Sequence, residues 1–114
     1  MTSPVLLFSY GTLQKRSIQI ANFGRELAGR ADALPGYAIR LVPVLDPKIA
    51  ALTGETQHAA AEPSPDPDDA IPGIVFEITP DELALADQYE QAANYRRISV
   101  TLRSGAQAWV YVRA

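Results

Sequence analysis

The sequence has no cysteine and a single histidine, His58, and these scarcities exclude several kinds of functional site. Without thiols the chain has no disulfide, no thiol nucleophile and no thiolate ligand for a metal ion. One histidine with no second histidine and no cysteine leaves a zinc site without its usual ligands. We therefore expect no metal site, and a chain without disulfides fits a reducing cytoplasm.

Long apolar runs and clusters of positive charge are missing as well. The run from Val5 to Phe8 follows no basic segment and ends at polar Ser9, so it supports neither a secretory signal nor a membrane span. The formal net charge is −3, and basic residues occur only as isolated pairs such as Arg96-Arg97, which argues against nucleic acid as a main partner. We expect a cytoplasmic protein and leave its oligomeric state open.

Apolar content is sufficient for one core, because 47% of the 114 residues are hydrophobic. We therefore predict a single domain over residues 1–114. Within it, the segment 59–72 contains four prolines and four acidic residues, and such a composition predicts a mobile surface loop. A spacer is favoured for this loop over a lid on an active site. The loop holds −4 of the total charge of −3, so the rest of the chain sums to +1 and suits small anionic substrates.

Several short segments have the pattern of β-strands. Residues 5–10 form a short apolar run that predicts a strand buried on both faces and ended by Gly11. Residues 38–42, 73–78, 98–102 and 108–112 predict further strands, with turns at 34–37 and at Ser104-Gly105.

Two segments predict helices. One begins at Pro80, with Thr79 as N-cap and Glu82 completing a capping box, and runs to about residue 91 or 92. The other covers residues 17–27, and Arg25 near its end is either a carboxylate clamp or an ion-paired surface residue. Strands and helices in this mixed order do not alternate as in an α/β protein, so the sequence predicts an α+β fold.

The first candidate functional segment is Tyr10-Gly11-Thr12-Leu13, directly after the first predicted strand. Glycine carries no Cβ and adopts positive φ easily, so Gly11, Thr12 and Leu13 can present successive N–H groups to a carboxylate or carbonyl oxygen. The hydroxyl of Thr12 adds a further polar group. Four residues match many chains, however, and an ordinary turn from strand to helix is an equal alternative.

The second candidate is Glu90, at the edge of the apolar stripe of the helix that begins at Pro80. A carboxylate at that position is costly unless it has a partner or its charge is needed. Glu90 has three interpretations: a functional acid, a structural ion pair with Arg96 or Arg97, or a glutamate that faces water. Asp87 is its neighbour along the helix and is read as a solvated acid, although it could also raise the pKa of Glu90.

Taken together, the Tyr10-Gly11-Thr12-Leu13 segment, the Tyr89-Glu90 dipeptide and Tyr95-Arg96-Arg97 resemble the γ-glutamylcyclotransferase superfamily, in particular its compact AIG2-like branch. The resemblance spans nearly the whole chain and implies a small mixed β-barrel with about two helices. One departure is Gln91, where many members have glycine after the glutamate; this puts the choice of substrate in doubt.

The resemblance also implies an activity and a set of site residues. A γ-glutamyl amine, amino acid or peptide would be converted to 5-oxoproline and a free amine, without a cofactor. Glu90 would be the catalytic residue. The substrate-binding residues would be Tyr10, Gly11, Thr12, Leu13, Tyr95 and Arg97. The alternative is a binding or regulatory module that keeps the backbone N–H groups of the Tyr10–Leu13 turn for a small ligand and lacks turnover.

Overall fold

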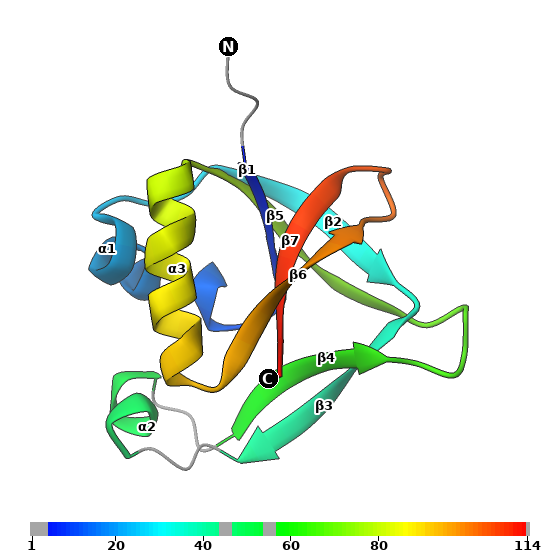
Figure 1. Cartoon of the computed structure of the whole chain (residues 1–114), viewed down its shortest axis with the longest axis horizontal. Helices are drawn as coiled ribbons and strands as arrows, with labels where there is room; N and C mark the ends of the chain where they lie inside the picture. The colour runs from blue at the N-terminus through cyan, green and yellow to red at the C-terminus, as the bar shows by residue number, and fades with distance from the viewer. Residues whose placement is uncertain (1–4, 44–46, 54–56, 114) are drawn as a thin grey trace.

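The centre of the protein is a mixed sheet of seven strands, with helices α1 and α3 packed together on one of its faces (Figure 1). A computed structural model describes residues 5–43, 47–53 and 57–113. The strands are β1 (Val5–Ser9), β2 (Gly29–Pro35), β3 (Tyr37–Pro43), β4 (Gln57–Pro63), β5 (Ala70–Ile78), β6 (Tyr95–Thr101) and β7 (Gln107–Arg113). The helices are α1 (Arg16–Phe23), α2 (Pro47–Thr53) and α3 (Pro80–Ala92), with a 3-10 turn, η1 (Thr12–Gln14). The α+β class predicted from the sequence is confirmed.

Strand β1 lies in the middle of the sheet, antiparallel to β5 and parallel to β7. Leu7 belongs to the core that α1 and α3 cover, and Phe8 belongs to a second core made by strand residues and the turns between them. Both side chains are almost completely inaccessible. Burial on both faces explains why a short apolar run without alternation forms this strand.

The predicted barrel is only loosely correct, because the sheet is not closed. Its strand order is β2-β5-β1-β7-β4-β3, and β6 pairs with β7 outside this path. The two strands at the ends of the path, β2 and β3, follow one another in the chain and are separated by Gly36, whose φ of 79° is favoured by glycine. The sheet therefore curls until its ends meet at Gly36, without a hydrogen-bonded ladder between β2 and β3 in the described residues.

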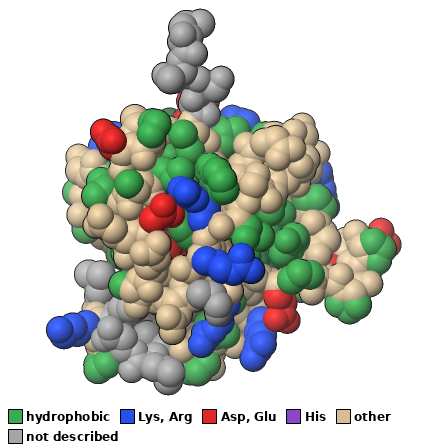
Figure 2. Space-filling view, viewed as in Figure 1, with side chains coloured by type: hydrophobic (Ala, Val, Ile, Leu, Met, Phe, Trp, Pro, Cys, Tyr) green, Lys and Arg blue, Asp and Glu red, His purple; other side chains and the backbone are tan. Residues whose placement is uncertain are grey.

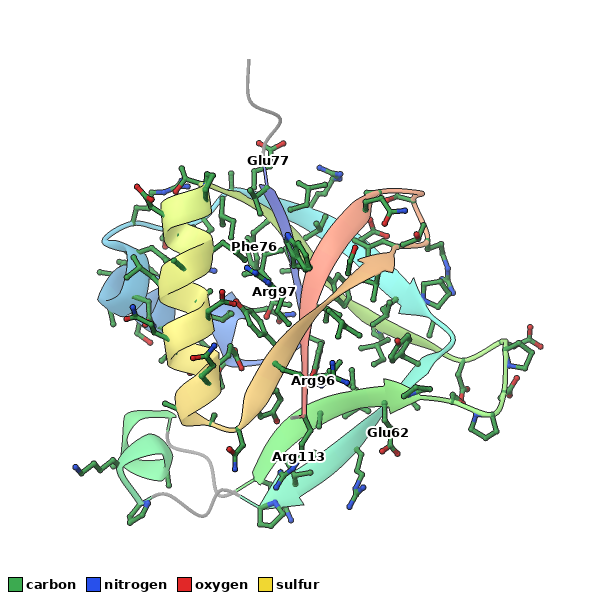
Figure 3. The ribbon with its side chains drawn as sticks, viewed as in Figure 1. Glu62, Phe76, Glu77, Arg96, Arg97 and Arg113 are labelled. Carbon is green, nitrogen blue, oxygen red and sulfur yellow. The ribbon has the colours of Figure 1, made fainter. Side chains whose placement is uncertain are left out.

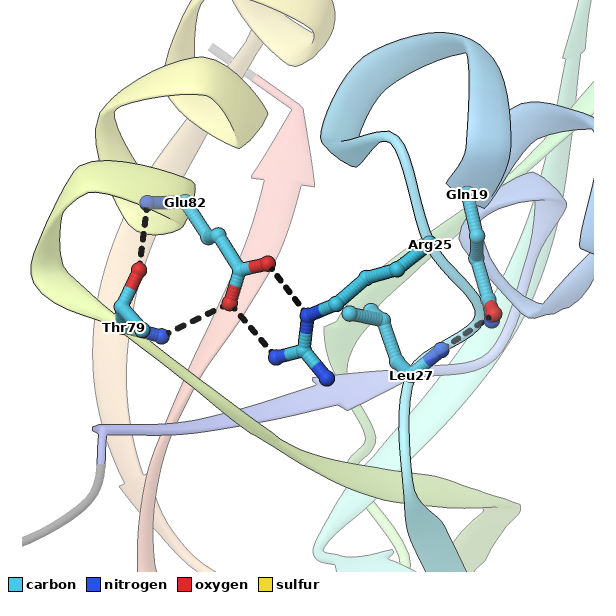
Figure 4. A network of polar contacts seen from close by, with 5 residues as sticks. All are labelled: Gln19, Arg25, Leu27, Thr79 and Glu82. Atoms are coloured by element: carbon cyan, nitrogen blue, oxygen red, sulfur yellow. Dashed lines mark hydrogen bonds and ion pairs between the residues drawn. The ribbon is translucent and has the colours of Figure 1, made fainter.

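Helix α3 begins as the sequence predicts. Thr79 accepts a hydrogen bond from the backbone N–H of Glu82, and the Glu82 carboxylate accepts one from the backbone N–H of Thr79. The same carboxylate binds Arg25 through two hydrogen bonds of 2.8 Å, from Nε and Nη2 (Figure 4). The bidentate contact with Arg25 keeps the pKa of Glu82 below its usual value. Arg25 is therefore an ion-paired residue that joins the loop after α1 to the start of α3.

Two predicted boundaries need correction. Helix α1 ends at Phe23 because Gly24 takes a left-handed conformation, with φ of 73°, as its C-cap, so the prediction of a helix over 17–27 was too long. The predicted loop at 59–72 is shorter than expected, since β4 extends to Pro63 and β5 begins at Ala70. Ala60 and Ala61 are buried in this part of β4. Pairing of β4 with β3 and β7 outweighs a local composition that disfavours a strand.

Candidate active site

A cavity of about 350 Å³ opens where η1, the last turns of α3 and strands β3, β4, β6 and β7 come together. Six of the seven residues predicted for the site line it, and Arg97 does not. The six are Tyr10, Gly11, Thr12, Leu13, Glu90 and Tyr95. Residues far apart in the sequence therefore share one cavity. The sequence analysis missed Tyr111 and Leu41 as lining residues, because nothing in their local patterns separates them from ordinary strand positions.

The turn at Gly11 forms without the positive φ that glycine allows. Its φ is −139°, and the chain passes through Gly11 into η1, where Gln14 N–H donates to the Gly11 carbonyl oxygen over 3.1 Å. The first N–H groups of any helix have no acceptor within that helix. The N–H groups of Thr12 and Leu13 donate to no acceptor among the described residues. These two donors can bind an oxygen of a ligand.

Two glutamines hold this turn in place. Gln14 Nε2 donates to the Ser9 carbonyl oxygen over 2.6 Å, just before the turn. Buried Gln19 donates from Nε2 to the Leu13 carbonyl oxygen over 2.8 Å and accepts the Leu27 N–H at Oε1 over 2.9 Å (Figure 4). Gln19 thus connects η1 to the segment that leads into β2. Sequence patterns gave no signal for it, because a polar residue on a short helix is normally exposed.

Tyr10 and Tyr95 form cavity walls, and their hydroxyl groups are engaged with the protein. Tyr10 donates to the Tyr111 carbonyl oxygen over 2.7 Å and accepts the Ala61 N–H over 2.8 Å, so it connects β7 and β4. Tyr95 donates to the Ala59 carbonyl oxygen over 2.9 Å. Burial raises the pKa of Tyr95 to about 12 and raises that of Tyr10 further. Both phenols therefore stay neutral near pH 7.

Helix α3 is tied to the turn by a direct contact. Thr12 Oγ1 and the Tyr89 hydroxyl oxygen lie 2.8 Å apart in a hydrogen bond. The hydroxyl of Thr12, expected from the sequence to be available to a ligand, is therefore shared with Tyr89. This bond keeps the residue before Glu90 next to η1.

Glu90 is a carboxyl group without an ion pair or hydrogen bond among the described residues. The alternative of a structural ion pair with Arg96 or Arg97 is therefore not observed. Its side chain keeps some accessible surface on the cavity wall, but dense surrounding protein raises its pKa to about 8. Near neutral pH the group can both accept and release a proton.

Arg97 and Asp87 occupy positions that differ from the prediction. Arg97 Nη1 lies 3.2 Å from Asp87 Oδ2, and its guanidinium group stacks over the Trp109 ring, 4.4 Å from the ring centroid. Asp87 also accepts a 2.7 Å hydrogen bond from Tyr111 at Oδ1. Asp87 is therefore partnered, contrary to the expectation of a solvated acid. Arg97 positions Asp87 and, through it, the Tyr111 ring on the cavity wall.

The described residues contain no group of three or more His, Asp or Glu side chains arranged to hold a metal ion. In the same part of the chain, every helix is too short or too polar to cross a bilayer.

The chain matches the profile of a family described as "Gamma-glutamyl cyclotransferase, AIG2-like" over residues 7–114. No curated protein matches it by sequence.

Three solved structures are similar to it. An Arabidopsis thaliana protein superposes with a TM-score of 0.75 at 19% identity, covering 98% of this chain and 70% of the other. A gamma-glutamyl cyclotransferase superposes with a TM-score of 0.74 at 15% identity, covering 98% and 68%. An uncharacterized human protein gives 0.73 at 19% identity, covering 99% and 68%. At these identities the structural similarity establishes the fold.

Proposed function

Because the chain belongs to the AIG2-like gamma-glutamyl cyclotransferase family, we propose that it converts a γ-glutamyl amine, amino acid or peptide to 5-oxoproline and the free amine. The observation that supports this most directly is Glu90, a carboxyl group with no partner in the described part of the chain and a pKa raised to about 8, in a cavity that also holds the η1 amides. An acid that is neutral and unpartnered at rest suits proton transfer better than a structural role.

Substrate binding would use two groups of the cavity wall differently. The Thr12 and Leu13 N–H groups would donate to oxygen atoms of the γ-glutamyl group, and Glu90 would face its α-ammonium group. That positive charge favours the ionised carboxylate, so substrate binding would lower the pKa of Glu90 from its resting value of about 8. The ionised group is then ready to act as a base.

In the reaction, Glu90 would take a proton from the α-ammonium group, and the free amine would attack the γ-carbonyl carbon. The new C–N bond closes the five-membered ring, and the bond to the departing nitrogen breaks. The attacking nitrogen loses two protons in all and the departing nitrogen gains two, so one carboxyl group that alternates between base and acid can carry both transfers. Attacking and attacked atoms belong to one molecule, and the protein mainly holds them in a reactive geometry.

A binding module without turnover is the second candidate. The described residues that line the cavity include no arginine or lysine, so a carboxylate of the ligand would be held by amide and hydroxyl donors alone. Such a cavity could bind 5-oxoproline or a γ-glutamyl compound without turning it over.

One experiment separates the two candidates. Purified protein is incubated with γ-glutamylamines, γ-glutamyl amino acids and glutathione, and 5-oxoproline is measured by mass spectrometry, with Glu90→Gln as the control. Release of 5-oxoproline by the parent alone supports catalysis. A folded parent that binds 5-oxoproline in calorimetry yet releases none from any of these compounds would favour the binding module.

A further inference from the structure

A second hollow, of about 270 Å³, is lined by residues of β3, β4, β6 and β7, strands that also contribute to the candidate active site. Successive residues of a strand point to opposite faces, and this alternation separates the residues of β6 and β7 that line the two cavities, except for Arg113, which pairs with Tyr95 at the end of β7 and yet lines the second hollow. Tyr95 and Tyr111 line the first cavity, and Arg96 and Val112 line the second. The floor of the second hollow is apolar, and three arginines from three strands surround it: Arg40, Arg96 and Arg113.

Positive charge at this hollow is only partly compensated. Glu62 is the one acidic residue that lines it, and its carboxylate lies 3.7 Å from Arg40, with both side chains more than half exposed. An ion pair that is so long and so exposed contributes little to stability. Within the described residues, Arg96 and Arg113 have no ion pair and no side-chain hydrogen bond. Figure 3 shows Arg96, Arg113 and Glu62 around β4, and Figure 2 shows Lys and Arg side chains, in blue, gathered over the same part of the surface.

We infer that this hollow binds a small organic anion, with its phosphate or carboxylate group between Arg96 and Arg113 and its apolar part on the floor. The guanidinium fork matches either anion with two parallel hydrogen bonds. Ile98, Val112 and Ala61 supply the apolar surface, and the partly buried Tyr37 ring lies at its border. The net charge of −3 favours a small anion over a polyanion, which the rest of the surface would repel.

This site is independent of the proposed cyclotransferase activity, and its test needs no turnover. The ¹⁵N-labelled protein is titrated at constant ionic strength with phenyl phosphate, benzoate and inorganic phosphate, while backbone amide shifts are recorded. We expect saturable shifts concentrated at Ala61, Glu62, Ile98 and Arg113, with phenyl phosphate or benzoate binding more tightly than inorganic phosphate. The comparison of phenyl phosphate with benzoate distinguishes a phosphate ligand from a carboxylate ligand.

Variants locate the site. Arg96→Gln and Arg113→Gln should each weaken binding about tenfold or more, and Arg113→Lys should weaken it less, because lysine keeps the charge and loses the fork. Arg103→Gln is the matched control, since Arg103 is also exposed but lies in the turn between β6 and β7. Amide spectra show whether each variant is folded. If Arg96→Gln does not fold, Arg113→Gln alone tests the site.

Three results would overturn the inference. The first is shifts spread over all arginines, and the second is equal weakening by Arg103→Gln. The third is binding of a hexaglutamate peptide at Arg96 and Arg113 when none of the small anions binds there, which would make the hollow part of a protein-binding surface.

Discussion

At the scale of single residues, Glu90 differs from Glu82 and Asp87, the two partnered acids of α3, by what it lacks. Glu82 binds Arg25, and Asp87 binds Tyr111 and Arg97. Glu90 has no such partner among the described residues, and burial alone raises its pKa. A carboxyl group in this condition costs stability when it ionises, which is tolerated where ionisation serves a function.

Replacing Glu90 with glutamine should therefore keep the fold and remove the proton transfer. On a substrate that the parent turns over, we expect kcat/KM to fall by about two to four orders of magnitude, the usual value of a positioned acid–base group. Steady-state kinetics and circular dichroism of both proteins test this. Glu77→Gln is the control, because Glu77 is exposed on β5 and lies outside the cavity. Unchanged turnover in Glu90→Gln would contradict the assignment.

The same substitution should change how stability depends on pH. Glu90 has a pKa of about 8 in the folded protein against an ordinary value of 4.5, so between these values the folded state binds more protons than the unfolded state. Its contribution to stability is therefore present below about pH 4.5 and is lost as the pH rises to about 8. The free energy of unfolding of Glu90→Gln, minus that of the parent, should rise across this window by a few kcal/mol.

Urea unfolding of the two proteins at several pH values between 5 and 9 measures this difference. Glu77→Gln should show no comparable trend. If the difference in the free energy of unfolding between Glu90→Gln and the parent stays constant over the whole pH range, Glu90 is ionised in the folded protein at neutral pH.

Residue identities were predictable from the sequence where local spacing determined them. Helical spacing placed Glu90 at the edge of the apolar stripe, and the resemblance to the γ-glutamylcyclotransferase superfamily then led to six of the residues that line the cavity. The location of Arg97 was not predictable in this way, because its partner Asp87 belongs to α3 and its stacking partner Trp109 belongs to β7. That contact exists only after three separate elements have packed.

At the scale of elements, strong local sequence signals were sufficient to predict a helix or strand, and weak ones were not. The capping box at Thr79 predicted the start of α3, and the apolar run in β1 predicted a buried central strand. Strands β2 and β4 were missed because their residues favour a strand only when paired: β2 with β5, and β4 with β3 and β7. Pairings between distant segments are not visible in local composition.

Close packing of β5 against β1 predicts that Gly73 cannot be replaced by alanine without a large loss of stability. A Cβ at Gly73 would lie 2.5 Å from the Ser9 carbonyl oxygen and 2.6 Å from the Phe8 ring. The backbone oxygen cannot move away without disturbing the β1–β5 ladder, so we expect Gly73→Ala to lower the free energy of unfolding by about 1–3 kcal/mol. Chemical unfolding measures this loss of stability. Glu77→Ala is the control, because Glu77 is exposed on the same strand. Equal stability of the two variants would show that β5 can shift.

Gln19 gives a prediction about the coupling of α1 to the turn at η1. Gln19→Leu would leave the Leu13 carbonyl oxygen and the Leu27 N–H without their partner, at a cost of about 1–3 kcal/mol for the buried groups. Because Leu13 lines the cavity, KM should also rise, whereas a purely structural role would lower stability alone. Asn22→Ala is the matched control, since Asn22 bonds only within α1, to Ile18. A lower melting temperature with unchanged KM would separate Gln19 from the site.

At the scale of the whole molecule, the two cavities share strands β3, β4, β6 and β7, and the acidic turn at 64–69 lines neither of them. The turn lies beyond the ends of β4 and β5, on the side of the molecule away from α3 (Figure 1). It is held by bonds of its own, including Asp69 N–H to the Asp66 carbonyl oxygen, and by Gly36, which bonds to both Ser64 and Asp69. These positions favour a spacer over a lid.

Replacing residues 65–68 with two glycines should therefore leave kcat/KM unchanged on any substrate that the parent turns over. Ser64 and Asp69 stay in place, so their bonds to Gly36 can form in the variant. Stability should change by no more than about 1 kcal/mol, because the entropy of loop closure varies slowly with length. Kinetics and thermal unfolding of the variant test both expectations. The results can be interpreted only if the amide spectrum shows that β4 and β5 are unchanged in the variant. A stable variant that has lost turnover would show that the acidic turn closes over the cavity during the reaction, as a lid does.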